Sequence, residues 1–268
     1  MFWHTANQKE RKGRRDFQSE TALLVIMQQL DFVGKTKEEL AIEFIRENEP
    51  PNGYAVMYSG GKDSDVLTHL AWRSGVSWIP FYSLMPDPPE LIKYTTTKFP
   101  HLRILRPQYS FWRGIVNKFP PHRKAAWCCT EIKEKPSREI GLTYRLVGIR
   151  AEESSNRAKL GWVNQITKQR INLHPLYNWK EWEIWDYIER NGLKYCSLYD
   201  EGLSRLGCVV CPKRTNSKAQ EFYRKRWPQY FRLFEKQVKK WWKLKGQYRE
   251  NETAQSAEEF LHNWYQGK

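Results

Sequence analysis

A short polar turn follows the apolar run Tyr54–Tyr58 and combines two adjacent glycines with a lysine, an aspartate and two serines. The turn consists of Ser59, Gly60, Gly61, Lys62, Asp63 and Ser64. Adjacent glycines allow positive φ angles and let the backbone approach a ligand closely. Apolar residues recur at helical spacing after the turn, so the first amides of a helix and the positive end of its dipole should face the ligand. The turn therefore predicts a phosphate site between a strand and a helix. The alternative is an ordinary turn, with Asp63 or Ser64 capping the helix.

Four of the five cysteines form two pairs, Cys128 with Cys129 and Cys208 with Cys211, and Cys196 stands apart. In a reducing compartment, a Cys-x-x-Cys sequence with a second pair indicates a metal site. Adjacent cysteines rarely direct both sulfurs at one zinc ion, whereas they can bind different irons of a cluster. The pattern favours a [4Fe–4S] cluster, with zinc and buried or redox-active thiols as alternatives. We expect Cys196 to be a packed core residue.

The composition describes a globular chain with an anionic partner. The 268 residues include 45 Lys and Arg against 30 Asp and Glu, a formal charge of +15, and are 40% hydrophobic. This charge favours nucleic acid as a partner, with a solvated basic surface as the alternative. The basic start lacks a signal-peptide apolar segment, and the longest early apolar run is too short to span a bilayer. We expect a cytoplasmic protein without a membrane partner.

Hydrophobic periodicity predicts the elements that must position these residues. Two amphipathic helices are expected over 17–32 and 36–48, and the second begins with a capping-box pattern at Thr36. Strands are predicted over 54–58, 77–84, 102–106, 145–149 and 171–176, and helices over 64–73, 89–98, 110–118, 130–140 and 179–190. This alternation indicates an α/β fold with a doubly wound, mostly parallel sheet. The ligand site of such a sheet lies at the carboxyl ends of its strands.

The region after residue 205 is basic and aromatic. Its basic residues are Lys213, Arg214, Lys218, Arg224, Lys225, Arg226, Arg232, Lys236, Lys239, Lys240, Lys243 and Lys245. Such side chains, interleaved with Tyr223, Trp227, Tyr230 and Trp241, could contact phosphates and stack on unpaired bases. The aromatic residues also recur at helical spacing, so we expect most of them to pack on the domain beneath an exposed basic face. A first basic run, Lys9 to Arg15, could be an arm or could extend that face.

Five motifs in a fixed order carry a specific resemblance. They are SGGKDS at 59–64, WCCTEIK at 127–133, GIRAEESSNRA at 148–158, HPLYNWKEWEIWDYI at 174–188 and LYDEGLSRLGCVVCP at 198–212. Over roughly residues 50–235 the chain resembles the phosphoadenosine phosphosulfate (PAPS) reductase family of the PP-loop ATP pyrophosphatase superfamily. The resemblance implies an adenine nucleotide alpha hydrolase-like fold. The cysteine pairs are similar to those of iron–sulfur adenylylsulfate (APS) reductases, which implies that all four thiolates bind one [4Fe–4S] cluster.

Two departures from the reductases shape the functional hypothesis. Those enzymes use a cysteine in a C-terminal tail as nucleophile, and this sequence has no cysteine after Cys211. They also tend to carry a degenerate phosphate loop, whereas the loop here is intact. In this the chain resembles the sulfurtransferases of DNA phosphorothioation and tRNA thiolation. That resemblance implies an ATP pyrophosphatase that adenylates a substrate, with DNA or tRNA as the acceptor and a sulfur-donor protein as a partner. The alternatives are an APS or PAPS reductase that releases sulfite, and a non-catalytic nucleotide-binding subunit of a nucleic-acid modification complex.

The resemblance also suggests roles for individual residues. Lys62, Asp63 and Arg150 are the predicted catalytic residues, and ATP, Mg²⁺ and a [4Fe–4S] cluster are the predicted cofactors. The residues predicted to bind the nucleotide are Ser59, Gly60, Gly61, Lys62, Asp63, Ser64, Arg150 and Arg157. Asp63 could hold Mg²⁺ or cap the helix. We expect His174 and Trp179 to be packed structural residues.

The same reading divides the chain into three parts. Residues 1–50 are predicted to form an N-terminal helical cap, and residues 51–195 the PP-loop nucleotide-binding domain. Residues 196–268 would form the Cys-x-x-Cys segment and a basic, aromatic helical tail. We found no internal repeat or low-complexity segment that would suggest another arrangement.

Overall fold

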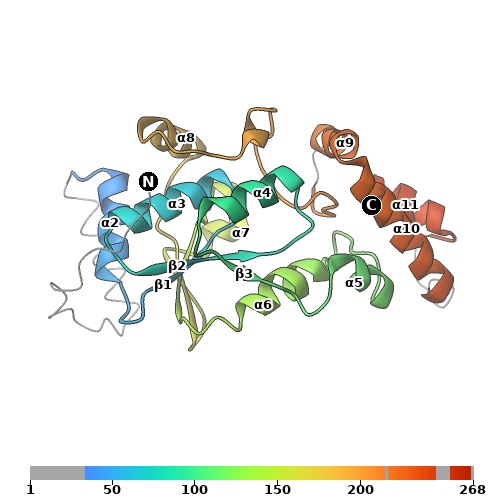
Figure 1. Ribbon diagram of the computed structural model, residues 1–268, viewed down its shortest axis with the longest axis horizontal. Helices are drawn as coiled ribbons and strands as arrows, with labels where there is room; N and C mark the ends of the chain where they lie inside the picture. The colour runs from blue at the N-terminus through green and yellow to red at the C-terminus, as the bar shows by residue number, and fades with distance from the viewer. Residues whose placement is uncertain (1–33, 215–216, 246–253, 267–268) are drawn as a thin grey trace. The chain divides into compact units, whose positions relative to one another are not determined.

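The computed structural model describes residues 34–214, 217–245 and 254–266 (Figure 1). The helix predicted over 17–32 and the basic run from Lys9 to Arg15 lie outside these residues. The chain divides into two compact units. The first contains the described residues up to Tyr82 together with Tyr94–Arg103 and Ile140–Cys196. The second contains Ser83–Lys93, Ile104–Glu139 and the described residues from Ser197 onward. The three-part division by residue range stays a prediction.

The strands form one six-stranded sheet in the order β3-β2-β1-β4-β6-β5. The strands are β1 (Tyr54–Met57), β2 (Trp78–Ser83), β3 (Arg103–Leu105), β4 (Tyr144–Val147), β5 (Val163–Thr167) and β6 (Arg170–Leu173). β1 pairs in parallel with both β2 and β4, β4 pairs in parallel with β6, and β5 pairs antiparallel with β6. This sheet confirms the predicted α/β class with a mostly parallel sheet.

The direction of winding reverses beside β1. The chain runs outward from β1 to β2 and β3, then returns to add β4 on the other side of β1. Such a reversal leaves a crevice at the carboxyl ends of the two central strands, where α/β sheets bind ligands. The glycine turn directly follows β1, and Gly148 directly follows β4. The topology thus brings two of the predicted motifs to the same edge of the sheet.

The helices either flank the sheet in the first unit or belong to the second unit. They are α2 (Lys37–Glu47), α3 (Lys62–Arg73), α4 (Pro89–Lys98), α5 (Phe111–Asn117), α6 (Lys135–Ser137), α7 (Ser155–Ala158), α8 (Glu181–Arg190), α9 (Ser217–Arg226), α10 (Pro228–Lys245) and α11 (Ala257–Tyr265). A π-helix, η2, covers Cys129–Glu134, and single 3-10 turns, η3 and η4, cover Ala151–Glu153 and Ser197–Tyr199. The capping box at Thr36 is present, as predicted. None of the helices that the structure describes is long and apolar enough to cross a membrane.

Three predicted elements needed correction, and one strand was missed. Helix α3 begins at Lys62 rather than at residue 64, because Gly61 in extended conformation leads directly into the helix. The helix predicted over 130–140 is the π-helix η2 followed by the short α6. The strand predicted over 171–176 ends at Leu173, where a turn closes with Tyr177 N donating to His174 O at 3.0 Å. β5 was missed because it is a largely exposed edge strand without an apolar face.

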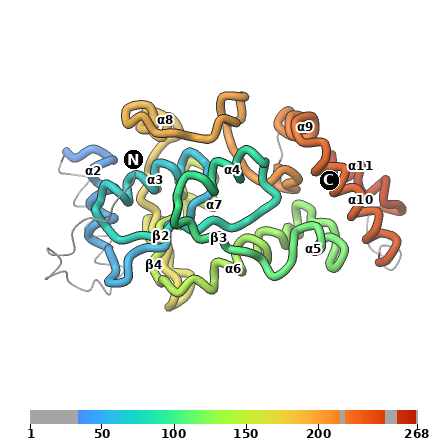
Figure 2. Tube along the Cα trace, in the orientation of Figure 1, coloured from blue at the N-terminus to red at the C-terminus, as the bar shows by residue number. Residues whose placement is uncertain are grey.

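Each unit has an apolar core of its own. In the first unit, α2, α3 and α8 pack together around fully buried residues such as Tyr54, Leu67 and Ile184. In the second unit, α10 and α11 lie side by side (Figure 2), and Trp241 and Phe234 of α10 are buried. The tail aromatics therefore pack mostly inward, as their helical spacing predicted.

Candidate functional site

The glycine turn is held open at the N-terminus of α3. Gly60 has a φ of +72°, which side chains rarely allow, and Gly61 is the N-cap without a side-chain cap. The two serines close the turn from within, because Ser59 N donates to Ser64 Oγ at 3.2 Å and Ser64 Oγ donates to Gly61 O at 2.8 Å. Neither Asp63 nor Ser64 is the N-cap, so the alternative of an ordinary side-chain-capped turn is wrong. The positive end of the helix is left for an anion.

The turn contains one buried cation, and a second buried cation contacts it. Lys62 and Arg150 are each 4% exposed. Lys62 Nζ lies 3.1 Å from Glu181 Oε1 and 3.7 Å from Asp63 Oδ2. Arg150 Nε donates to Asp63 Oδ1 at 2.5 Å. Lys62 and Arg150 thus both lie against the Asp63 carboxylate, and the structure brings the three residues predicted to be catalytic together.

Arg150 is charged and only partly satisfied. Burial is the largest influence and lowers its pKa, but the charge and hydrogen bond of Asp63 and the charges of Glu153 and Glu152 outweigh it and raise the pKa. Its Nη1 is buried and lies 3.5 Å from Glu152, yet makes no hydrogen bond within the described chain. A buried guanidinium with an unused donor is suited to bind an anion that arrives later.

Gly148 allows the β4 loop to approach the glycine turn. A Cβ at this position would lie 3.3 Å from the backbone oxygen of Asp63, closer than most side chains tolerate. The glycine thus lets the segment carrying Arg150 reach Asp63. Arg157, the second predicted phosphate clamp, instead forms an ion pair with Glu153 from the short helix α7.

Sequence reasoning missed several residues around the loop. Glu181, at the start of α8, forms an ion pair with Lys62. The sequence motif that contains Glu181 drew attention only to His174 and Trp179. His174 and Trp179 are buried, as expected of packed residues. Asp65 was also missed because a charged residue in the first turn of a helix ordinarily faces solvent.

Asp65 is the centre of a buried hydrogen-bond network. Its carboxylate accepts from Tyr58 Oη at 2.7 Å, Tyr94 Oη at 3.0 Å and Lys98 Nζ at 2.5 Å. Tyr94 Oη also lies 2.5 Å from Lys194 O, so its single hydrogen is shared between that carbonyl and the Asp65 carboxylate. Burial raises the Asp65 pKa from 3.8 to about 6, against the opposing influence of Lys98 and the tyrosines. The network ties the first turn of α3 to α4 and to the segment after α8.

The four paired cysteines all belong to the second unit, and none is in a disulfide. Cys128 forms a hydrogen bond with Cys129, and this bond, burial and the charges of Cys129, Cys208 and Cys211 all raise the Cys128 pKa. The hydrogen bond with Cys128 and the positive charges of Lys213 and Lys133 outweigh burial and lower the pKa of Cys129 to about 6. Four thiols that influence one another, with two lysines nearby, match the donors and compensating charge that an anionic thiolate cluster requires. Cys196 is buried, as expected.

Backbone contacts fix both cysteine segments. Val209 N donates to Pro86 O at 2.8 Å. The Arg214 guanidinium donates to the carbonyls of Cys208 and Val209 and lies 3.4 Å over the Tyr223 ring. Cys129 opens the π-helix η2, a geometry that is frequent at functional sites.

The described residues contain no group of three His, Cys, Asp or Glu side chains arranged to hold one metal ion. A tetrahedral zinc site requires its ligands to converge on a single ion. A [4Fe–4S] cluster takes one thiolate at each iron, so its four sulfurs surround a cube rather than a single ion. Mg²⁺ in phosphate sites often takes only one or two carboxylates, with the rest of its shell from phosphates and water. The cluster and Mg²⁺ both stay predictions.

The profile of the phosphoadenosine phosphosulfate reductase domain matches residues 53–214, more than half of the chain. The chain belongs to this family. Members named as reductases are enzymes that act on adenine nucleotides, and the resemblance seen in the motifs is confirmed.

Each relative matches only part of this chain, and the match takes up only part of the relative's own length. An uncharacterized protein of Methanocaldococcus jannaschii is 29% identical over 171 residues, 60% of this chain and 42% of that protein. The adenosine 5'-phosphosulfate reductase of Staphylococcus haemolyticus is 30% identical over 133 residues, 46% of this chain and 53% of the reductase. The chain spans about half the length of the curated relatives that it matches.

One solved structure supports the fold. The crystal structure of phosphoadenylyl-sulfate reductase from Candida auris, in a phosphate complex, has a TM-score of 0.54 at 19% identity. The match covers 73% of this chain and 98% of that chain. At this identity the likeness concerns the fold alone.

Proposed function

We propose that this chain is an iron–sulfur PP-loop ATP pyrophosphatase that adenylates a nucleic-acid acceptor for sulfur transfer. The observation that carries the proposal is the uncapped N-terminus of α3, bordered by buried Lys62 and by Arg150 with an unused donor. A finished nucleotide needs binding groups only, whereas cleavage of ATP needs cations where charge develops on the leaving group.

The reaction follows from where these charges lie. An acceptor oxygen attacks the alpha-phosphorus of ATP, a new oxygen–phosphorus bond forms, and the bond to the beta-phosphate bridging oxygen breaks. The electron pair leaves with pyrophosphate, whose developing charge meets the α3 amides and Lys62. A sulfide-level sulfur from a donor then attacks the acceptor atom that bears the adenylated oxygen. A bond to sulfur forms, the bond from that atom to the oxygen breaks, and its electron pair leaves with AMP.

Each residue has a task in this scheme. Gly60 and Gly61 admit the phosphates, and Ser59 and Ser64 keep the turn in shape. Arg150 donates to the alpha-phosphate, and Asp63 orients Arg150 rather than capping the helix. Mg²⁺ would bind together with the phosphates. Asp63 is the carboxylate within the turn that could join its coordination shell.

The cysteine site would hold a [4Fe–4S] cluster through Cys128, Cys129, Cys208 and Cys211. Such a cluster supplies a soft, anionic, sulfur-rich centre that can support folding, tune the local field or take part in sulfur delivery. Lys133 and Lys213 would offset its charge, and Arg214 would hold the Cys208 segment in place.

A reductase that acts on adenylylsulfate and releases sulfite is the second candidate. The 30% identity over 133 residues to a reductase of that substrate favours it. A non-catalytic nucleotide-binding subunit would bind ATP and release nothing.

Pyrophosphate release from ATP, with and without DNA or tRNA, separates these candidates. We expect Lys62→Ala to lower the rate about a hundredfold or more, because one cation is lost from the developing charge. Lys168→Ala, which removes an exposed lysine from the turn between β5 and β6, should leave the rate unchanged. Sulfite release from adenylylsulfate without pyrophosphate release from ATP would establish the reductase instead.

A further inference from the structure

The second unit contains a pocket of about 560 Å³ that none of the predicted roles uses. Its walls come from the segment after β2, the segment after β3, the start of α5, the π-helix and α10. Leu84, Met85, Pro86, Arg106, Pro107, Ser110, Phe111, Trp112, Ile132, Gln229, Tyr230 and Leu233 line it. This volume is typical of small-ligand sites and is ample for one nucleotide base with its sugar.

The pocket wall is aromatic and carries a few polar groups. The rings of Trp112 and Tyr230 are 6.0 Å apart, and Phe111 packs beside Trp112 with ring centroids 5.1 Å apart. Tyr230 Oη donates to Asp87 O at 3.1 Å, which fixes its ring. Arg106 and Ser110 are exposed at the lining. Fixed aromatic faces with a nearby cation suit a planar base attached to a phosphate.

The pocket adjoins both cysteine segments of the same unit. Pro86 of the lining accepts the hydrogen bond from Val209, which lies between Cys208 and Cys211. Ile132 of the lining belongs to the π-helix that begins at Cys129. The pocket lining and the two cysteine segments are thus joined by a backbone hydrogen bond and by a shared π-helix within the second unit.

A basic stripe on α10 leads away from the pocket. Gln229 and Leu233 line the pocket, and Lys236, Lys240 and Lys243 follow at steps of three, four and three residues. Such spacing places side chains on one face of a helix, at intervals of about 4.5 to 6 Å along its axis. Within the described chain no carboxylate pairs with these three lysines, and all are exposed.

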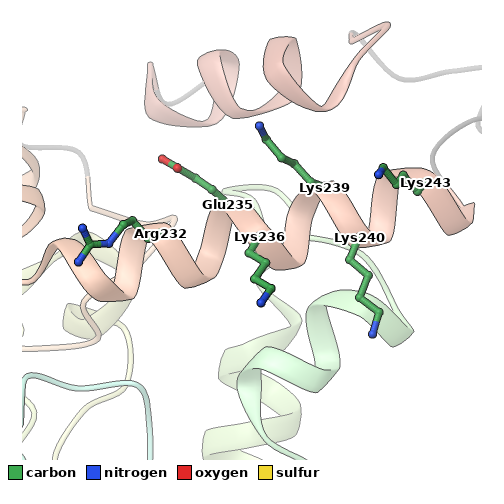
Figure 3. Close-up of a pocket in the computed structure, with 6 residues that line it drawn as sticks. All are labelled: Arg232, Glu235, Lys236, Lys239, Lys240 and Lys243. Carbon is green, nitrogen blue, oxygen red and sulfur yellow. The ribbon is translucent and has the colours of Figure 1, made fainter.

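Neighbouring charges on α10 are arranged differently. Figure 3 shows Lys236 and Lys240 extending from one side of α10, and Glu235 and Lys239 from the other. Lys239 Nζ pairs with Glu258 at 3.0 Å, and Glu235 accepts from Tyr265 Oη at 2.6 Å. Among the α10 lysines that the structure describes, Lys239 is therefore paired, whereas Lys236, Lys240 and Lys243 have no partner among the described residues; Arg232, one turn before Lys236, is exposed and has no carboxylate partner there either.

We infer that a single strand of nucleic acid binds along this stripe, with one unpaired base in the Trp112–Tyr230 pocket. Lys236, Lys240 and Lys243 contact successive phosphates, and the aromatic walls stack on the base. Charge complementarity selects a polyanion, and the aromatic pocket at the end of the stripe selects a nucleic acid over an acidic protein surface. The inference rests on the proposed function only in calling this strand the acceptor.

The test is equilibrium binding of a fluorescein-labelled single strand to the full chain, followed by anisotropy at several salt concentrations without ATP. Lys236, Lys240 and Lys243 changed together to Gln should flatten the slope of log K against log salt by about 2, because each phosphate contact contributes about 0.7. Gln at Lys159, Lys168 and Lys194 makes the same charge change on exposed lysines of the first unit and should leave the slope intact.

The base pocket needs a separate readout. Trp112→Leu should weaken binding about tenfold at fixed salt with the slope unchanged, and Trp112→Phe should restore most of it. An abasic strand keeps the phosphates but has no base to stack. It should bind the wild type about tenfold more weakly than the intact strand does. The Trp112→Leu variant should bind the abasic and intact strands equally well. Strands of DNA and RNA with the same sequence identify which of the two is preferred.

Several results would overturn the inference. Equal affinity of wild type for the intact and abasic strands would leave the pocket without a base. Loss of ATP binding in Trp112→Leu would assign the pocket to the cofactor. Absence of binding at low salt would leave the stripe to an acidic protein. None of these assays needs catalysis, so a failure of pyrophosphate release would refute the proposed function and leave this inference standing.

Discussion

The pair between Asp63 and Arg150 gives the sharpest test of the site. The perturbations are Asp63→Asn, Arg150→Met and the double variant, all close to the original side chains in volume. Arg150 is 4% exposed and its Nε donates to Asp63 at 2.5 Å, so Asp63→Asn leaves a buried charge with Glu152 as its nearest compensation at 3.5 Å.

The expected magnitudes follow from burial. Removing one partner of a fully buried pair typically costs about 3 to 5 kcal/mol. Because Glu152 remains, we expect Asp63→Asn to lower the free energy of unfolding by about 2 kcal/mol. Arg150→Met leaves a carboxylate that still has Lys62 at 3.7 Å, and should cost about 1 to 2 kcal/mol. The double variant should be more stable than the sum by about 1 to 2 kcal/mol, the coupling expected of contacting residues.

The same three variants test the chemistry. If Asp63 acts by orienting Arg150, each single variant should lower pyrophosphate release about a hundredfold, and the double variant should lose no more than either. Urea unfolding gives the stabilities, and a coupled pyrophosphate assay gives the rates. Additive stabilities, or rate losses that multiply in the double variant, would refute the reasoning and show that Asp63 acts independently, as a ligand of Mg²⁺ would.

Three further predictions concern other parts of the chain. Anaerobically purified protein should be brown and contain iron and acid-labile sulfide; Cys211→Ser should bleach it and Cys196→Ala should not, and a colourless protein with one zinc would contradict the cluster. Gly148→Val should abolish pyrophosphate release by pushing on the Asp63 backbone, while Gly141→Val, where a Cβ meets nothing within 4 Å, should be tolerated; equal activity would dismiss the close approach. Because the Asp65 pKa is raised from 3.8 to about 6, its stabilising contribution is complete below about pH 4 and declines as pH rises through 6. The unfolding free energy of wild type relative to Asp65→Asn should therefore fall by up to about 3 kcal/mol between pH 4 and 7, and a flat difference would show that Asp65 titrates normally.

Local patterns were sufficient to predict most elements and the residues of the loop. Apolar runs and helical periodicity identified β1, α4 and α10, because hydrophobic spacing reports which face of an element is buried. The glycine turn was recognisable because glycine readily adopts the positive φ found at Gly60, which other residues rarely do. Edge strand β5 escaped because an exposed strand needs no apolar face.

The partners of each charge could not be predicted from sequence. Asp63 was expected to hold Mg²⁺ or to cap α3, yet it pairs with Arg150, which lies 87 residues further along the chain. Asp65 is buried beneath Tyr58, Tyr94 and Lys98 although its position in the first turn suggested solvent. The stripe on α10 and the pocket lined by α5 meet only because the chain folds them together.

The sequence by itself determined which groups exist and how they are spaced within one element: the phosphate turn, the cysteine pairs and the basic helix. Tertiary structure decided which of those groups meet, which charges are neutralised and which donors stay unused. The physical reason is that spacing within a helix or strand is set by local geometry, whereas ion pairing and burial depend on contacts between residues far apart in the chain.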